Sequence, residues 1–447
     1  MQPRQPEQPR RITAADIEKR RALRRKKQRQ KRLRATLLLV LAVALIVGVV
    51  LLLRSCAGRD GGKTLPEDSS AQSGGDASKS EEPQTTPADT EPAAPQQTRL
   101  HFLGAGDNIM HDAILADAKK RSDDGGYAFA PMYAGIASLV SDADIAFINQ
   151  EGPVGAGTKY VGYPDFNAPL AVFETLQDLG FDVVNLANNH MLDQGEQGLI
   201  KTIDNAKNYT FLTIGGYTKA DYDSLRILER DGVKIAFLSY TTLVNVAHKG
   251  DISSSSAYLI PYADEATITR QVAAAKEAAD FVIVSMHWGE EAGWDQKSNF
   301  TENAQQQRYA KLCADLGVDV VVGHHPHVVQ PVTWIEGANG GKTLVYYSLG
   351  NLICTMHYAQ YLVGTLCTFD LVKNADGTTA VENPMCVPTV SHYSLNRDGL
   401  QVYRLQDYSE VLAAQHGSTL KNEFTYALLQ KFIKETVSAE FLPEFLH

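Results

Sequence analysis

Short runs of β-branched and other apolar residues recur from residue 99 onward, and most of them end at a polar residue. Continuous apolar runs of this length are typical of strands in a parallel sheet that is covered on both faces. We predict a first strand that ends at Gly106, followed by strands at 144–149, 182–186, 234–240, 281–286, 318–322 and 343–348.

Helical patterns lie between the earlier of these strands. Leucine and phenylalanine repeat at helical spacing over residues 170–179, and Gly180 follows as a predicted helix end. Asp264 and Thr301 are predicted N-caps of two further helices, which end near residues 279 and 317. Alternating strands and helices predict an α/β fold in which helices cover the sheets.

After about residue 343 the predicted elements are strands only, at 364–372 and 379–390, which indicates a second, more antiparallel sheet. The globular domain therefore covers residues 99–395. Residues 396–447 are predicted to be a helical C-terminal extension.

The segment 35–53 is uncharged and apolar for 19 residues and lies between Arg34 and Arg54. A bilayer-spanning helix needs about 20 such residues, whereas the apolar core of a cleaved signal peptide has about 7–15. The preceding segment 1–34 contains 14 Lys and Arg residues, a bias that places it in the cytoplasm. We predict a single-pass anchor in the cell membrane with an extracytoplasmic domain. A cleaved signal peptide, and a nucleic-acid-binding role for the basic arm, are the competing interpretations.

Residues 54–98 are rich in Gly, Ser, Pro, Gln and acidic residues and cannot bury enough apolar surface to fold. They are predicted to be a disordered linker from the membrane to the domain. The five cysteines are widely spaced and form no C-x-x-C motif, so neither a disulfide framework nor a zinc ribbon is implied.

Residues 99–447 contain 24 basic and 41 acidic residues, a balance of −17. Such an acidic domain is a poor docking surface for nucleic acid, which we exclude as a partner. An acidic polymer would bind only where a metal ion or a focused basic patch overcomes the repulsion.

The candidate chemistry is concentrated around residues 318–331, VDVVVGHHPHVVQP, where a predicted strand runs directly into three histidines. In open α/β sheets, ligands bind at the carboxyl ends of the strands. In an extended chain, His325 and His327 would point to one side and His324 to the other. Neutral imidazole is the commonest protein ligand for divalent metals, although a surface loop that is merely rich in histidine is the alternative.

Other predicted strands also end at residues with oxygen or nitrogen ligands. The candidates at these ends are Asp107, Glu151, Asn188, Asn189, His190, His287, His325, His327, Ser348 and Asn351. Taken singly, each of them has an ordinary explanation as a turn former, a cap or a buried polar residue. Carboxylate, amide and imidazole without thiolate suit Mn²⁺, Fe²⁺ or Zn²⁺. Six metal ligands drawn from this set would exceed the four of a closed zinc site, so two divalent metal ions are the natural number.

Six segments in order resemble the capsule-synthesis CapA family over residues 99–395: GDNIMHD, INQEGPV, LANNHMLDQG, SMHWGEE, GHHPHVVQP and YSLGN. The resemblance implies a role in poly-γ-glutamate capsule production. It also implies a calcineurin-like metallophosphoesterase sandwich, with two sheets flanked by helices.

The resemblance also implies roles for the candidate residues. The implied metal ligands are Asp107, Glu151 as the bridging carboxylate, Asn189, His287, His325 and His327. His190 is the implied general acid, and Asn188, Ser348 and Asn351 are candidates for substrate binding. The implied partners are the membrane, other capsule-synthesis membrane subunits, and an acidic polymer or envelope substrate.

The sequence departs from ordinary metallophosphoesterases at two positions. Those enzymes begin with Asp-x-His, whereas Ile109 occupies the third position here, and Glu151 stands where they use Asp. One hypothesis is therefore a metal-dependent hydrolase or transferase acting on a capsule or envelope substrate. The other is a non-catalytic assembly or export subunit of a capsule synthase that binds polymer. A soluble intracellular phosphatase would require that residues 35–53 do not span the membrane.

Overall fold

The computed structural model describes residues 97–245, 252–291, 299–420 and 422–447. The predicted basic tail, the predicted membrane helix and residues 54–96 of the predicted linker lie outside these ranges. Within the described ranges, no helix combines the length and the apolar character needed to cross a membrane.

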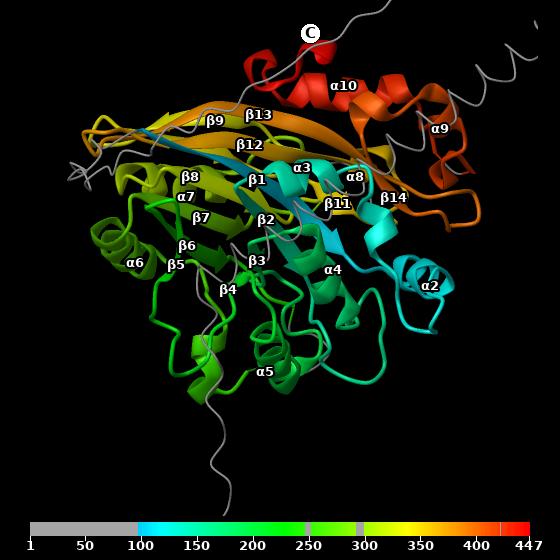
Figure 1. The fold of residues 1–447 in the computed structure, drawn as a ribbon, viewed down its shortest axis with the longest axis horizontal. Coiled ribbons are helices and arrows are strands. Elements are labelled where there is room, and N and C mark those ends of the chain that lie inside the picture. Colours follow the sequence, from blue (N-terminus) through cyan, green and yellow to red (C-terminus); the bar gives the residue numbers. More distant parts are fainter. Residues whose placement is uncertain (1–96, 246–251, 292–298, 421) are drawn as a thin grey trace, which may run out of the picture. The chain divides into compact units, whose positions relative to one another are not determined.

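Two β-sheets pack against each other, and β1 (Thr98–Ile109) lies near the centre of the first (Figure 1). On one side β1 pairs in parallel with β2, and on the other it pairs antiparallel with β12. The order of the first sheet is β14-β13-β12-β1-β2-β3-β4, with β11 also paired to β1. Its other strands are β2 (Ile145–Glu151), β3 (Val183–Asn185), β4 (Leu212–Ile214), β11 (Asn351–Ile353), β12 (Val363–Lys373), β13 (Thr379–His392) and β14 (Gln401–Arg404).

The second sheet has the order β5-β6-β7-β8-β10-β9, and its central strands β6, β7, β8 and β10 run parallel. Its strands are β5 (Arg226–Arg230), β6 (Val233–Thr241), β7 (Phe281–His287), β8 (Val320–His324), β9 (Val332–Glu336) and β10 (Lys342–Tyr346). Phe102 of β1 connects the two sheets, because its ring stacks on Phe147 and Phe369 of the first sheet and on Phe237 of the second.

Helices α6 (Glu265–Ala278) and α7 (Ala304–Asp315) pack on the outer face of the second sheet, in a separate apolar layer. The helices associated with the first sheet are α2 (Asp112–Lys120), α3 (Ala137–Asp142), α4 (Ala171–Leu179), α5 (Gly195–Ala206) and α8 (Ala359–Leu362). The C-terminal helices α9 (Glu410–Ala414) and α10 (Tyr426–Thr436) lie near β13 and β14 (Figure 1). The arrangement confirms the predicted α/β fold with two sheets.

Local sequence signals account for several element boundaries. Gly180 ends α4 in the left-handed conformation (φ 107°), as predicted. Asp264 caps α6, since its side chain accepts a hydrogen bond from the Thr267 backbone N–H at 2.9 Å, also as predicted. The predicted cap at Thr301 is wrong. Asn303 caps α7 instead, in a reciprocal capping box with Gln306.

The predicted second, antiparallel sheet after residue 343 is also wrong. The antiparallel strands β12 and β13 extend the first sheet beyond β1 and do not form a sheet of their own. One edge of β1 pairs with β2, and the other edge is free for a strand from later in the chain. The order of strands along the chain does not show which later strand takes that edge. β14 lies within the segment predicted to be a helical extension, and it pairs with β13.

Candidate metal centre

Parallel strands of both sheets end at one common edge and bring the predicted residues together. Asp107 is opposite Asn351 in the β1–β11 pair, and His287 is opposite His324 in the β7–β8 pair. The backbone N–H of Asp107 donates to the carbonyl of Gly350 at 3.0 Å, so the segment after β10 returns directly beside the end of β1. Gly106 permits this approach, because a Cβ at that position would collide with the Gly350 carbonyl.

Asp107 is fully buried at the centre of this edge. Its Oδ1 accepts from Asn149 Nδ2 at 2.8 Å, and its Oδ2 lies 3.1 Å from His327 Nδ1. Burial raises the pKa of Asp107, but the contacts with His324 and His327 outweigh this effect and hold the pKa well below its usual range. Asp107 is therefore an ionised carboxylate in the interior.

Asn149 connects Asp107 to the second sheet. Asn149 Oδ1 accepts from Asn185 Nδ2 at 2.8 Å, and Asn185 Oδ1 accepts from the Ser239 hydroxyl at 2.5 Å. All three side chains are buried. This chain of hydrogen bonds fixes the direction of the Asp107 carboxylate from β2, β3 and β6.

The turn after β8 does not have the extended backbone that the sequence suggested. His325 and His327 have positive φ values of 99° and 59°, so the alternation of side chains ends at His324. The expectation that His324 points away from the site is consequently wrong: its Nδ1 lies 3.3 Å from Asp107 Oδ1, and its ring packs on Phe147. His325 and His327 nevertheless converge, with ring centroids 6.0 Å apart.

His327 contacts more candidate ligands than any other imidazole described in this structure. Its Nδ1 lies 3.0 Å from Asn351 Oδ1, while its Nε2 lies 3.7 Å from Glu151 Oε1 and 3.8 Å from Glu291 Oε1. Burial lowers the pKa of His327, but the charges of Glu151, Asp107 and Glu291 outweigh it and raise the pKa to about 10. The carboxylates that raise this pKa would favour a cation at this position.

Two further histidines of this centre, His287 and His325, stay neutral at neutral pH. Burial lowers the pKa of His325 to about 4 and lowers the pKa of His287 well below its usual range. Their rings lie 4.8 Å apart, and His287 Nε2 is 3.0 Å from Asn189 Oδ1. Neutral imidazole is the form that binds a metal.

Glu151 is a buried carboxylate, and neither of its oxygens has a hydrogen-bond partner. Burial raises its pKa to about 8. A buried acid without partners is costly, which makes it a candidate for a group that acquires a cation.

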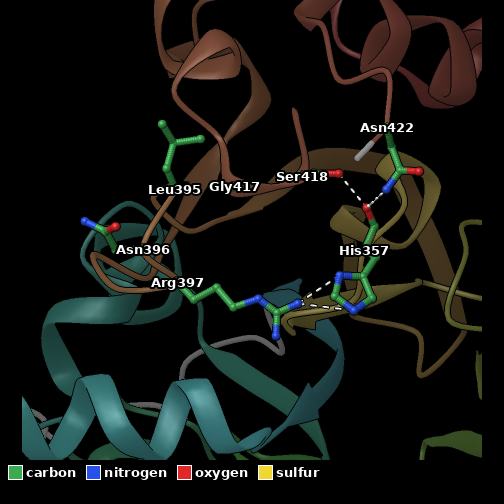
Figure 2. Close-up of a pocket in the computed structure, with 7 residues that line it drawn as sticks. All are labelled: His357, Leu395, Asn396, Arg397, Gly417, Ser418 and Asn422. Atoms are coloured by element: carbon green, nitrogen blue, oxygen red, sulfur yellow. Dashed lines mark hydrogen bonds between the residues drawn. The ribbon is translucent and has the colours of Figure 1, made fainter. Parts of the chain in front are cut away.

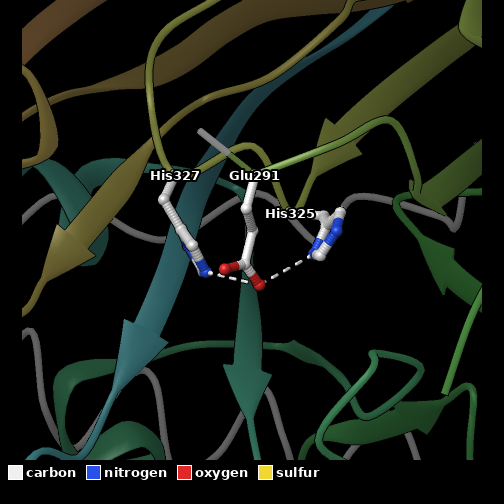
Figure 3. A group of neighbouring side chains, drawn as sticks. All are labelled: Glu291, His325 and His327. Carbon is white, nitrogen blue, oxygen red and sulfur yellow. Dashed lines mark ion pairs between the residues drawn. The ribbon is translucent and has the colours of Figure 1, made fainter. Parts of the chain in front are cut away.

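Glu291 is a member of this centre that the sequence analysis did not identify. Its carboxylate lies between His325 and His327 (Figure 3), with Oε1 3.8 Å from a nitrogen of each ring. Its side chain is 47 % exposed, so it forms the solvent side of the centre. The motif HWGEE after β7 contains this residue, and its position four residues beyond His287 was the available signal.

These residues fit the binding of divalent metal. Two groups have ligand atoms within 4.8 Å of one another, and His327 belongs to both: Asp107, Glu151 and His327, and Glu291, His325 and His327. Nine buried side-chain polar atoms in the described ranges have no hydrogen-bond partner, and six of them belong to Glu151, His287, His324 and His325. Unpaired buried polar atoms are rare, so their concentration at one sheet edge fits a binding site for a cation.

His190 lies beside this centre. Its Nδ1 is 2.8 Å from Asp193 Oδ2, its Nε2 is 3.9 Å from Glu151 Oε1, and its ring meets the Phe166 ring edge-on. Burial lowers the pKa of His190, but the hydrogen bond to Asp193 and the charge of Glu151 outweigh it, so the net pKa is raised. The Asp193 hydrogen bond at Nδ1 leaves Nε2 to face Glu151. Asp193, three residues after His190, was not identified from the sequence.

The three residues predicted to bind substrate make internal contacts. Asn188 donates to the carbonyls of Gln150 and Leu186 and accepts from the His190 backbone N–H. Asn351 holds His327 from both sides, through its Oδ1 and through a bond from its Nδ2 to the His327 carbonyl. The Ser348 hydroxyl accepts from the Gly350 N–H. All three residues thus hold the loops at the strand ends in place through hydrogen bonds, and their role in substrate binding stays a prediction.

Ile109, which stands at the position of the usual first-motif histidine, is buried and apolar. It offers no ligand atom. His324 is the additional imidazole that approaches Asp107, and it does so from β8 rather than from β1.

Residues 101–356 match the family described as "Bacterial capsule synthesis protein PGA_cap". The chain belongs to this family. The match confirms the resemblance drawn from the six sequence segments, and it covers all the residues of the candidate metal centre described above.

Two relatives in this family carry related names. The chain is 32 % identical over 230 residues to the "PGA biosynthesis protein CapA" of Bacillus subtilis, covering 51 % of this chain and 57 % of that protein. It is 30 % identical over 305 residues to the "Capsule biosynthesis protein CapA" of Bacillus anthracis, covering 64 % of this chain and 68 % of that protein. The similarity to the first relative thus spans little more than half of its length.

Among solved structures, the Haemophilus influenzae NAD nucleotidase is similar to this chain with a TM-score of 0.41 and 14 % sequence identity. The similarity covers 76 % of this chain and 60 % of that one.

Proposed function

We propose that this member of the capsule synthesis family is a metal-dependent hydrolase or transferase that binds two divalent metal ions, Mn, Fe or Zn. Its substrate would be a capsule polymer, the attachment point of that polymer, or a phosphorylated envelope intermediate. The observation that carries the proposal is Glu151, a buried carboxylate with two unpartnered oxygens that faces imidazoles of His327 and His190.

The residues that would hold the metals are those that converge in the structure. One ion would take Asp107, Glu151 and His327, and the other would take Glu291 and His325, with His287 and Asn189 beside them. Bound divalent cations would supply Lewis acidity and a nucleophile derived from water.

His190 has the arrangement of a general acid. Asp193 fixes the ring through Nδ1, and the raised pKa favours the form that carries a proton on Nε2. Phe166 packs against the ring and restricts its movement. From this position His190 would donate the Nε2 proton to a leaving group at the Glu151 side of the centre.

We further propose that residues 35–53 anchor the chain in the cell membrane, with the N-terminus in the cytoplasm and the domain outside. The supporting observation is the 19-residue apolar run after a basic segment. Membrane subunits for capsule synthesis and an acidic polymer or envelope component are the partners that this location would favour. Poly-γ-glutamate is the polymer that the resemblance to the CapA family implies.

A second candidate function is supported by Ile109. Because this buried apolar residue supplies no ligand to the first metal position, the domain could instead bind polymer without catalysis, as an assembly or export subunit. The number of bound metal ions separates the two functions, since a polymer-binding subunit has no need of a dinuclear centre.

The decisive experiment is metal analysis of the purified full-length chain, compared with the double variant His325→Ala/His327→Ala. We expect about two equivalents of a transition metal in the wild type, as in dinuclear hydrolases, and a loss in the variant. His101→Ala is the matched control, because it removes an exposed imidazole near the start of β1. A folded wild-type chain that stays metal-free in excess Mn²⁺ or Zn²⁺ contradicts the catalytic function and leaves the assembly role.

A further inference from the structure

A pocket of about 390 Å³ opens beside the loop that follows β13. Arg397 extends into it toward His357, and Ser418 and Asn422 approach from the C-terminal segment (Figure 2). Both Ser418 Oγ and Asn422 Nδ2 donate to the His357 carbonyl, at 2.5 and 2.8 Å. These bonds join the C-terminal segment to the segment that carries His357.

Arg397 has a positive charge that no acid of the described ranges pairs with. Its guanidinium donates to the His357 ring at 2.8 Å and lies 5.9 Å from the centre of the Tyr393 ring. The adjacent Asp398 is already occupied, because Lys120 reaches it at 2.6 Å and the Ser394 hydroxyl donates to it. A guanidinium held by an imidazole and an aromatic ring keeps donors available for an anion.

The loop that carries Arg397 is rigid enough to place it. Arg397 has a left-handed backbone (φ 58°), and its N–H donates to the Ser394 carbonyl at 2.8 Å. The Ser394 N–H in turn donates to the Asp398 carbonyl at 2.8 Å. These bonds close the turn at both ends and fix the direction in which Arg397 leaves it.

One short segment connects this pocket to the candidate metal centre. Asn351, at its start, holds His327, and His357, six residues later, lines the pocket. Six residues span at most about 20 Å. Between them the Thr355 N–H donates to His111 Nδ1 at 3.1 Å. Burial, together with the nearby positive charges of His327 and Arg397, lowers the pKa of His111 to about 3, so His111 lies within electrostatic reach of both sites.

Because the domain is acidic, an arginine without an acidic partner is a candidate binding site for an anion. Residues 99–447 carry a net charge of −17, which repels acidic substrates over most of the surface. A guanidinium binds carboxylate and phosphate through paired N–H donors, and it does so best where no competing acid is present. Arg397 combines this chemistry with a pocket at a distance that an extended substrate can bridge.

We propose that Arg397 forms a subsite for an anionic group, a carboxylate or a phosphate, of an extended acidic substrate whose reacting bond lies at the candidate metal centre. This inference rests on the proposed function and assigns Arg397 the role of positioning the substrate. The subsite would set the register of the substrate relative to Asp107 and Glu151.

The test is calorimetric titration of the full-length chain with three probes: a γ-linked glutamate tetramer, the same tetramer with its carboxylates amidated, and inorganic phosphate. In Arg397→Gln we expect the Kd of an anionic probe to rise about tenfold or more, because a hydrogen bond to a charged group is lost. Arg397→Lys should recover part of the affinity, since it keeps the charge but not the paired donors. Arg404→Gln is the matched control, because the Arg404 guanidinium already has Asp407 as its partner.

The results separate the sources of the anion and the two proposals. An effect on the tetramer alone assigns the subsite to carboxylate, and an effect on phosphate alone assigns it to phosphate. Equal affinity of the wild type and Arg397→Gln for both anionic probes, or binding of the amidated tetramer as tight as that of the acidic one, overturns the subsite. Metal content is measured in the same samples. A metal-free wild type contradicts the hydrolase, whereas the titrations alone decide whether Arg397 forms the subsite.

Discussion

At the scale of the residue, the defining feature is a set of buried polar groups that the protein itself does not satisfy. Glu151 and the histidines of β7 and β8 are positioned by strand ends, and Asn149 and Asn351 orient their neighbours. A core that leaves such groups unpaired loses stability, so their presence indicates selection for a ligand rather than for folding.

Glu151→Gln tests this interpretation directly. Losing this proposed carboxylate ligand should weaken metal binding at least tenfold, as even changes around a metal ligand do. Above about pH 8, where the Glu151 carboxyl ionises, the metal-free variant should melt at a higher temperature than the wild type, because it removes a buried charge that has no hydrogen-bond partner.

The measurement is thermal unfolding with and without added Mn²⁺. The wild type should gain stability on addition of the metal and the variant should not. A lower melting temperature of the metal-free variant would show that Glu151 stabilises the fold without metal.

A second residue-scale feature is a pair of buried histidines that attach the C-terminal segment to β13. His416 accepts from the Ser418 N–H at Nδ1, has its Nε2 3.1 Å from the Ser391 carbonyl, and stacks on Phe424. Burial lowers the pKa of His416 to about 3 and that of His392 to about 4. Both are neutral in the folded protein at neutral pH.

The sign of the pH dependence follows from these values. The unfolded chain binds these protons near pH 6.5 and the folded chain does not, so stability is present above about pH 6.5 and declines below it. His416→Gln should make this decline shallower by up to about 1.4 kcal/mol per pH unit. Urea unfolding between about pH 7.5 and about pH 4.5 measures it, with exposed His447→Gln as the control. Parallel curves for wild type and His416→Gln would contradict the assignment.

At the scale of the element, local capping determines where α7 begins. Asn303 and Gln306 satisfy each other's backbone N–H groups, whereas Thr301 precedes this box in an exposed turn. The sequence analysis took Thr301 as the cap, and the reciprocal pair of Asn303 and Gln306 places the cap two residues later. α7 packs on β9 and β10 through its buried face, so its start affects the second sheet.

Asn303→Ala should destabilise the protein by about 1 kcal/mol, because it removes a cap side chain. Thr301→Ala should change stability by less than about 0.5 kcal/mol, as is usual for surface substitutions. Chemical denaturation of both variants checks the difference. An equal loss of stability in the two variants would contradict the assignment of Asn303 as the cap.

At the scale of the whole molecule, the prediction concerns attachment to the membrane. The segment 35–53 has the length and composition of a spanning helix, and it precedes the described domain by a polar stretch. The full-length chain should therefore sediment with membranes, and a variant lacking residues 35–53 should be released. In intact cells stripped of their outer layers, added protease should digest the domain 99–447. A domain that is protected from protease, or a full-length chain in the soluble fraction, would contradict the predicted location.

The extent of prediction differs between these scales. The strand ends were predictable because each strand is a local apolar run followed by a polar residue, and the same local logic identified Asp107, Glu151 and His287. Gly180 and Asp264 were likewise identified correctly by signals within a single turn. The family resemblance rested on these same local segments.

Other features depended on contacts between distant segments. The direction of His324 was mistaken because positive φ values at His325 and His327 end the strand alternation. β12 joined the first sheet because β1 had a free edge, and β13 in turn paired with β12. The partners in the β1–β12 pair lie some 270 residues apart along the chain, as with Arg99 and Val372.

The sequence by itself therefore determined the α/β character, the candidate ligands at the strand ends and the family, since each depends on residues close together in the chain. Only the tertiary structure decided which imidazole approaches Asp107, that Glu291 closes the centre, and that Arg397 lies in a pocket near it. The physical reason is that distance and burial between segments are fixed by packing, and packing has no local signature in the sequence.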